Sequence, residues 1–146
     1  MDTFKGRAHH KMDAKGRVSL PAKYRTTLAA QDLVLVPGTD NCLWLYTDEG
    51  YKELIKPLRN KQFDRKYDLL RDLFVAGAED IEVDGSGRIR VPAEQRDFAS
   101  LSKEVTIVGK GDRLELWDSE RYRDRLKSID MDEALQVLTE YEGQND

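Results

Sequence analysis

The sequence contains one thirteen-residue stretch twice, and this duplication constrains the fold more than any other feature. Residues 13–25 read DAKGRVSLPAKYR, and residues 84–96 read DGSGRIRVPAEQR. The two stretches share six identities at a constant offset of 71 residues. The same offset pairs apolar positions further along, as it does for Leu45 with Leu116 and for Tyr51 with Tyr122. A correspondence that runs this far without a gap indicates duplication of a whole module.

The length of the chain bears on how the two modules fold. A chain of 146 residues is close to the usual size of one domain, so two modules more readily share one core than fold separately. We expect residues 1–76 to form the first repeat with its linking helices. Residues 77–146 are expected to form the second repeat with a C-terminal helical tail. Both should contribute to one compact core with pseudo-twofold symmetry.

Each repeated stretch has the composition of a tight turn between two short strands. Asp is favoured at the first turn position because its carboxylate accepts backbone N–H groups further round, and Gly is favoured where φ must be positive. Asp13 with Gly16, and Asp84 with Gly87, therefore follow from turn chemistry alone. We expect each Asp-x-x-Gly-Arg segment to be the tip of a hairpin.

Apolar periodicity predicts the same order of elements in both copies. Each half supplies about four short strands, too few to cover a sheet, so pairing the halves is expected to close a mainly β barrel with short helices. The tail helix should dock on the body or fray. Strands are expected at residues 4–12, 17–20, 33–36, 43–46, 81–83, 89–91, 105–108 and 114–117, and helices at 22–28, 64–76, 93–101, after residues 46 and 117, and from residue 131.

Charge is distributed unevenly along the chain, although the net charge is only −4. Residues 1–31 carry seven Lys and Arg against two acids, whereas the remainder carries 17 basic and 26 acidic residues. Such polarity suits a polyanion-binding front backed by an acidic body. An ordinary solvated basic surface would give the same count, so charge alone leaves both interpretations open.

Other features argue against an enzyme, a metal site or a secreted protein. Cys42 is the single cysteine, which favours a reducing compartment, and no signal or membrane-spanning segment is evident, so we expect a cytoplasmic protein. His9 and His10 are adjacent and cannot share a strand face, so no metal is expected. We also expect no cofactor, no small-molecule substrate and no membrane partner. Trp44 and Trp117 are expected in the core or a subunit contact.

The two turn arginines are not required by turn chemistry. One interpretation is a structural ion pair between Asp13 and Arg17, and between Asp84 and Arg88, although exposed pairs contribute only about 0–1 kcal/mol. The other is that Asp holds the guanidinium at the tip, where its planar fork can meet a phosphate or guanine. The two roles are compatible.

These motifs closely resemble the MraZ family over residues 4 to about 129. The resemblance is carried by Phe-Lys-Gly-Arg at 4–7, by both repeated stretches and by VTIVGKGDRLELW at 105–117. It implies an AbrB-like, double-split swapped-hairpin β-barrel made from two tandem repeats. It further implies a cytoplasmic, nucleoid-associated, sequence-specific transcriptional regulator. Such a regulator would form a ring homo-oligomer and bind double-stranded DNA at tandem short boxes upstream of a division and cell-wall gene cluster.

The resemblance carries the family's Asp-x-x-x-Arg motif onto Asp13 with Arg17 and onto Asp84 with Arg88. The first copy is the more basic, so we expect it to make most DNA contacts. The second copy is expected to hold the barrel or the ring together, which leaves a DNA role for Arg88 open. The residues that we expect to support Arg17 at the DNA are Lys5, Arg7, Lys15 and Arg25.

Two alternatives remain open at the level of sequence. One is a ring-forming interaction or structural protein that binds no specific DNA and whose basic front is merely solvated. The other is an antitoxin-like or global regulator of the wider AbrB group, although those proteins usually carry one motif per chain and this chain carries two.

Overall fold

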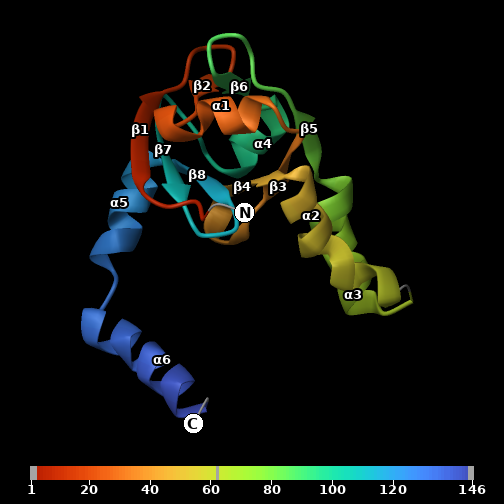
Figure 1. The fold of residues 1–146 in the computed structure, drawn as a ribbon, viewed down its shortest axis with the longest axis vertical. Coiled ribbons are helices and arrows are strands. Elements are labelled where there is room, and N and C mark those ends of the chain that lie inside the picture. Colours follow the sequence, from red (N-terminus) through yellow and green to blue (C-terminus); the bar gives the residue numbers. More distant parts are fainter. Residues whose placement is uncertain (1–2, 62, 145–146) are drawn as a thin grey trace.

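The computed structural model describes residues 3–61 and 63–144 and shows a mainly β protein with short helices (Figure 1). The strands are β1 (Arg7–Lys11), β2 (Arg17–Ser19), β3 (Leu33–Pro37), β4 (Leu43–Thr47), β5 (Glu79–Ile81), β6 (Arg88–Arg90), β7 (Glu104–Gly109) and β8 (Leu114–Asp118). The α-helices are α1 (Arg25–Ala29), α2 (Asp48–Ile55), α3 (Arg65–Arg71), α4 (Ala93–Phe98), α5 (Ser119–Lys127) and α6 (Met131–Gln144). Single 3₁₀ turns cover Ala22–Tyr24, Thr39–Asn41 and Lys56–Asn60, and a π-helical turn covers Asp72–Ala76.

The strands form an antiparallel six-stranded sheet in the order β1-β7-β8-β4-β3-β5 and a separate two-stranded ribbon of β2 with β6. The order is symmetric, because β1, β7 and β8 in one half of the sheet are equivalent by the 71-residue offset to β5, β3 and β4 in the other half. Each half of the sheet therefore contains strands of both repeats. Trp44 lies opposite Glu115 at the centre of the sheet, and Val18 lies opposite Ile89 in the ribbon. Each of these pairs is related by the 71-residue offset. The sheet and the ribbon are therefore centred on equivalent pairs.

The hairpins expected at the two Asp-x-x-Gly-Arg turns are wrong in one respect, because the two strands that flank each turn do not pair with each other. The Asp13–Arg17 turn is closed by the bond from Asp13 N to Arg17 O, yet β1 then pairs with β7 and β2 pairs with β6. Apolar alternation in a strand defines which face is buried and carries no information about the neighbouring strand. Among the described residues the strand pairs do not close into a barrel, and β1 and β5 remain the edges of the sheet.

Both faces of the six-stranded sheet are covered. On one face, Val18 and Leu20 of the first repeat and Ile89 and Val91 of the second pack with Leu28 and the inner sheet residues. On the other face, residues of α2, the Asp72–Ala76 turn and α5 cover a second cluster. Trp44 and Trp117 belong to this second cluster, in agreement with the expectation that they are core residues.

The helices begin where the sequence indicates. Pro21 and Pro92 end the ribbon strands and immediately precede the Ala22–Tyr24 turn and α4. Thr47 caps α2 by accepting from Gly50 N at 3.2 Å, and Asp118 caps α5 by accepting from Arg121 N at 3.2 Å.

The tail differs from the expectation that it docks or frays. It forms α6, which extends away from the sheet on the side opposite to α3 (Figure 1). Every residue from Met131 to Gly143 is exposed. The apolar residues Met131, Leu135, Val137 and Leu138 of α6 are thus exposed to solvent in this structure. None of the helices in the described ranges has the length and apolar character needed to cross a bilayer.

Leu35 provides a test of the core between ribbon and sheet. Its side chain is 0% exposed, so Leu35→Ala is expected to lower the free energy of unfolding by about 2–5 kcal/mol through lost burial and a residual cavity. Thr27→Ala, on an exposed position of α1, should stay within about 0.5 kcal/mol of wild type. Urea denaturation followed by circular dichroism measures both, and equal stabilities would contradict this account of the core.

Candidate nucleic-acid interface

The first turn is held together by the carboxylate of Asp13. Its Oδ1 accepts from Lys15 N at 3.0 Å and from Arg17 N at 2.9 Å, while its Oδ2 accepts from Arg17 Nε at 2.6 Å. Gly16 has φ +82°, a backbone conformation that residues other than glycine adopt only at a cost in free energy. Both features expected of the turn are therefore confirmed: the Asp13 carboxylate accepts backbone N–H groups, and Gly16 has positive φ.

The second turn repeats this geometry. Asp84 Oδ1 accepts from Ser86 N at 2.8 Å and from Arg88 N at 3.0 Å, and Oδ2 accepts from Arg88 Nε at 3.1 Å. Gly87 has φ +78°. The same backbone and the same ion pair thus occur in both repeats.

The ion pairs leave most of each guanidinium available. The pKa of Asp13 is lowered to about 2, chiefly by the hydrogen bond from the backbone N–H of Arg17. The pKa of Asp84 is also lowered, chiefly by the hydrogen bond from the backbone N–H of Arg88. Both carboxylates are therefore ionised at neutral pH and fix the Nε side of their arginines. Within the described ranges, neither Nη atom of Arg17 or Arg88 has a hydrogen-bond partner. Each turn can therefore offer two Nη groups, which carry four N–H donors, to a ligand.

The outer face of the ribbon concentrates positive charge. Val18 and Ile89 point into the core, so their neighbours point outward, where Arg17 lies directly opposite Arg90. Like charges at directly opposed positions destabilise a strand pair. Arg90 Nε also donates to Lys15 O of the first turn at 3.2 Å. Such a pair of arginines is understandable if an anion binds between or beside them.

Arg90 was not singled out by the sequence analysis as an interface residue. It could have been found from the sequence, because Arg90 alternates with the apolar Ile89 and Val91, a pattern that places it on the outer face of the strand. The pairing with the first repeat could not be inferred, because β6 and β2 are far apart in the sequence.

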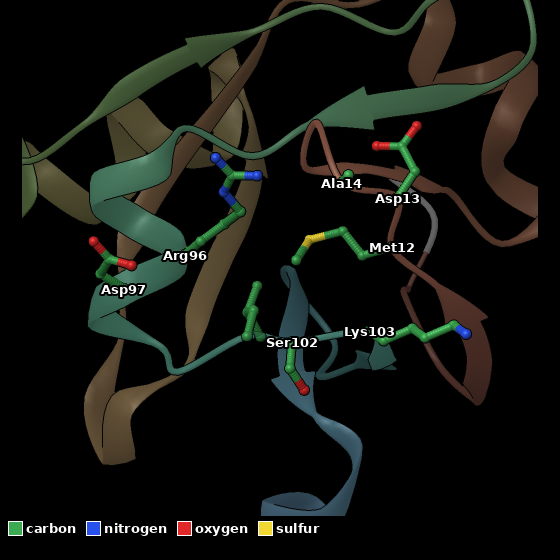
Figure 2. Close-up of a pocket in the computed structure, with 8 residues that line it drawn as sticks. Met12, Asp13, Ala14, Arg96, Asp97, Ser102 and Lys103 are labelled. Carbon is green, nitrogen blue, oxygen red and sulfur yellow. The ribbon is translucent and has the colours of Figure 1, made fainter.

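Each turn is braced by an arginine from the other repeat. Arg25 Nε donates to Leu20 O at 2.8 Å, and its Cδ lies 2.6 Å from the position that a Cβ on Gly87 would occupy. Reciprocally, Arg96 Nη1 lies 2.5 Å from the position of a Cβ on Gly16. Figure 2 shows Arg96 rising from α4 toward the turn that carries Asp13 and Ala14. The two glycines are thus required by space as well as by φ.

This bracing changes the assignment of Arg25. Its place in the chain associated it with the first turn, whereas it lies against the second turn, in a hollow shared with Asp84 and Ser86. The position beside the first turn is taken by Arg96, which lines a cavity of about 570 Å³ with Met12 and Lys103. Arg25 and Arg96 are related by the 71-residue offset, so the exchange follows from the crossing of the two repeats.

Lys5 and Arg7 do not join the turn arginines. Arg7 Nε donates to the Tyr122 hydroxyl at 2.9 Å, and Arg7 lies opposite Val108, which belongs to the cluster on the face away from the ribbon. Lys5 is fixed through its backbone, because Lys5 N donates to the Tyr24 hydroxyl at 2.9 Å. The expected grouping of Lys5 and Arg7 with Arg17 is not found.

The surroundings of the two turns differ in charge. Lys15 and Arg17 of the first turn lie beside Arg90 and Arg96, whereas the second turn has the neutral Ser86 at the position of Lys15. Arg17, Arg88 and Arg90 line a shallow hollow that also contains Asp80 and Glu82. The acids of this hollow therefore face arginines of both turns. The turns differ at position 15 against position 86, and in the residue across the ribbon, which is Arg90 for Arg17 and Ser19 for Arg88.

This fold and site define a class, namely small two-repeat β proteins that carry an Asp-x-x-x-Arg turn in each repeat. A family model described as "MraZ protein, putative antitoxin-like" matches residues 3–71 and 74–138. The chain belongs to the MraZ family, which confirms the resemblance indicated by its motifs.

Curated relatives agree with this assignment over most of their length. The protein named Transcriptional regulator MraZ from Methylobacillus flagellatus is 39% identical over 144 residues, which cover 96% of this chain and 97% of the relative. The protein of that name from Lachnoclostridium phytofermentans is 37% identical over 139 residues, covering 94% and 96%. That from Acetivibrio thermocellus is 40% identical over 120 residues, covering 82% and 83%.

The bracing of the first turn can be tested at Gly16. A Cβ there would lie 2.5 Å from Arg96 Nη1 and 2.7 Å from Val91 O, at φ +82°, so Gly16→Ala should lower the free energy of unfolding by about 2 kcal/mol or more. Gly111→Ala is the matched control, because Gly111 also has positive φ (+90°) but a Cβ there meets nothing within 4 Å. It should cost only about 1 kcal/mol, from the unfavourable φ, which is less than the cost of Gly16→Ala. Thermal and urea unfolding of both variants decide the matter, and equal effects would argue against a crossed brace.

Proposed function

We propose that the protein is a sequence-specific, double-stranded-DNA-binding transcriptional regulator that acts as a ring on tandem short boxes. Following the family resemblance, we place those boxes upstream of a division and cell-wall gene cluster. The observation that carries the proposal is the placement of Arg17 opposite Arg90 on the outer face of the ribbon, with both Nη atoms of Arg17 available. The names of the curated relatives support the regulatory role.

The chemistry of DNA accounts for this arrangement. The guanidinium fork of Arg17 is oriented through Nε and presents its Nη donors outward, as contact with a phosphate or with guanine O6 and N7 requires. Lys15, Arg90 and Arg96 add positive charge around it. We infer that the first turn makes most DNA contacts, whereas the second turn, which has Ser86 in place of Lys15 and Ser19 opposite Arg88, serves mainly as scaffold.

One turn cannot find a genomic site by itself. A good bidentate contact discriminates a base by about 1–3 kcal/mol, which is too little against the many competing sites of a chromosome. A ring of identical subunits presents the same turn repeatedly, and tethering multiplies weak contacts when boxes recur at a matching spacing. We therefore infer that ring formation and box spacing contribute as much as box sequence.

Two exposed helices support self-association. Met131, Leu135 and Leu138 form an exposed apolar stripe on α6, whose charged residues are all acidic. On the other side of the molecule, Leu69 of α3 and Leu73 of the following turn are also exposed. Residues 56–71, which include α3, hold six basic residues against two acids. We infer that α6 of one subunit packs on α3 of the next, a head-to-tail contact that closes into a ring when the rotation permits.

The remaining parts of the proposal follow from the same role. A regulator that binds promoter boxes works in the cytoplasm at the nucleoid, and each repeat, 1–76 and 77–146, supplies one turn to a shared core. The alternative is a ring-forming interaction protein without specific DNA binding. The exposed stripe on α6 would support that alternative as well, so the DNA test must be made with the oligomer intact.

Arg17→Ala tests the role of the first turn. Every subunit then loses one charge-assisted contact, so affinity for a labelled promoter fragment with tandem boxes should fall by about ten-fold or more, and the salt dependence of binding should become less steep. Arg123→Ala removes the same charge from an exposed position of α5 and should leave affinity near wild type. Fluorescence anisotropy at several salt concentrations measures both effects.

The comparison of Arg17→Ala with Arg88→Ala tests the asymmetry of the turns. We expect Arg88→Ala to lose less affinity, and equal losses would overturn the division between contact and scaffold. Wild-type affinity of Arg17→Ala, with the oligomer intact by light scattering, would contradict the DNA mechanism and favour the interaction protein.

The ring contact has a matched test within α6. Leu135→Asp with Leu138→Asp places acids in the apolar stripe and should reduce the molar mass in solution, because two charges would be buried in the subunit contact. Val137→Asp makes a similar change on the other side of the helix, where Val137 is also exposed, and should leave the mass unchanged. Size-exclusion chromatography with light scattering distinguishes them, and an unchanged mass for the double variant would refute the head-to-tail contact.

A further inference from the structure

A cavity of about 380 Å³ lies between β1 and the segment that leads into α1. Its apolar wall includes Ala8, Ile107 and Leu114, and its polar groups include His10, Lys23 and Arg25. Among the described residues, no carboxylate lines it. A mostly apolar cavity of this size with a few convergent cationic groups has the character of a small-ligand site.

His10 contributes a buried polar atom to this cavity. It lies opposite Val105, a core residue on the ribbon side of the sheet, and its Nε2 is buried without a hydrogen-bond partner in the described part of the chain. Burial and the charges of Arg25 and His9 lower the pKa of His10, so its imidazole is neutral at neutral pH. A neutral imidazole can donate or accept one further hydrogen bond, and buried polar atoms in native proteins normally have such a partner.

The second repeat shows that the fold does not require this cavity. Gln95 occupies the position equivalent to Tyr24, is 4% exposed, and bridges α4 to Leu35 O at 2.9 Å and Gly77 O at 3.1 Å. Tyr24 instead directs its hydroxyl to the backbone of Lys5. In the second repeat, the Gln95 side chain therefore connects the helix to the sheet. In the first repeat no side chain makes the equivalent connection to the sheet among the described residues, and the cavity lies there.

Lys23 is one of the basic residues that line the cavity. Its Nζ lies 5.0 Å from the centroid of the Tyr24 ring and 3.1 Å from the position of a Cβ on Gly6. Together with Arg25 it places two cations over an apolar wall, which matches a molecule with an anionic group at one end and an apolar body at the other.

We propose that this cavity binds a small aromatic anion, a carboxylate or a phosphate monoester. Lys23 and Arg25 hold the anionic group, the ring lies against Ala8, Ile107 and Leu114, and His10 supplies a hydrogen bond. This site shares Arg25 with the surroundings of the second turn, but it includes neither Arg17 nor Arg88 and does not depend on DNA binding.

Ligand-observed fluorine NMR with the full-length protein tests the proposal. The probes are 4-fluorobenzoate and 4-fluorophenyl phosphate, which separate the two anions, and 4-fluorobenzyl alcohol is the neutral control. Saturable line broadening is expected for at least one anion below about 10 mM, as its small size allows. Lys23→Gln should weaken that binding by about five-fold or more, since a charge-assisted contact is lost, and Lys103→Gln, an exposed lysine beside the other cavity, should not.

Three results would overturn the proposal. They are no saturable broadening by either anion, equal binding of the alcohol, and unchanged affinity in Lys23→Gln. Because the experiment contains no DNA, each of these results leaves the proposed regulatory function standing, and failure of DNA binding leaves this site standing.

Discussion

The two arginine turns exchange backbone hydrogen bonds, and the rest of the structure depends on this exchange. Leu20 N donates to Gly87 O at 3.0 Å, and Val91 N donates to Gly16 O at 2.8 Å. These bonds extend the β2–β6 ladder to the glycine of each turn, so the ribbon can bury Val18 and Ile89 while its outer face carries arginines. Because β2 and β6 pair with each other, neither pairs with the strand that precedes its turn. Those preceding strands, β1 and β5, pair with the six-stranded sheet instead.

Much of the local structure could be predicted from the sequence, because it depends on signals within a few residues. Asp13 and Gly16 define the turn, Pro21 and Pro92 end the ribbon strands, and apolar alternation locates the strands of the sheet. The hairpins β3–β4 and β7–β8 follow from strands separated by short turns. The partners of β1, β2, β5 and β6 could not be predicted, since a short apolar run such as Val18–Leu20 specifies a buried face and no neighbour. The same limit applies to α6, whose amphipathic pattern predicts a helix but not what covers it.

The candidate site shows how distance along the chain misleads. Arg25 follows the first turn closely in sequence, yet the crossing of the repeats carries it to Gly87 of the second. Arg90 belongs to the second repeat, yet it lies opposite Arg17. A charge count along the chain therefore includes residues that are not neighbours of the first turn: Arg7 is engaged with Tyr122 on the far face of the sheet. The asymmetry of the two turns that this count predicts stays a prediction.

The reciprocal braces have a consequence for how such a protein can vary. Since Arg25 and Arg96 each pack against the turn of the other repeat, and each ribbon strand bonds to the other's turn glycine, the smallest unit that presents either turn in this form is a pair of repeats. Covalent linkage makes that pairing independent of protein concentration. It also frees the two copies from being identical: tip positions such as 15 and 86 make only backbone contacts within their turns, so their side chains can diverge while the glycines and bracing arginines stay fixed. One repeat can then specialise in recognition while its twin preserves the geometry that both need.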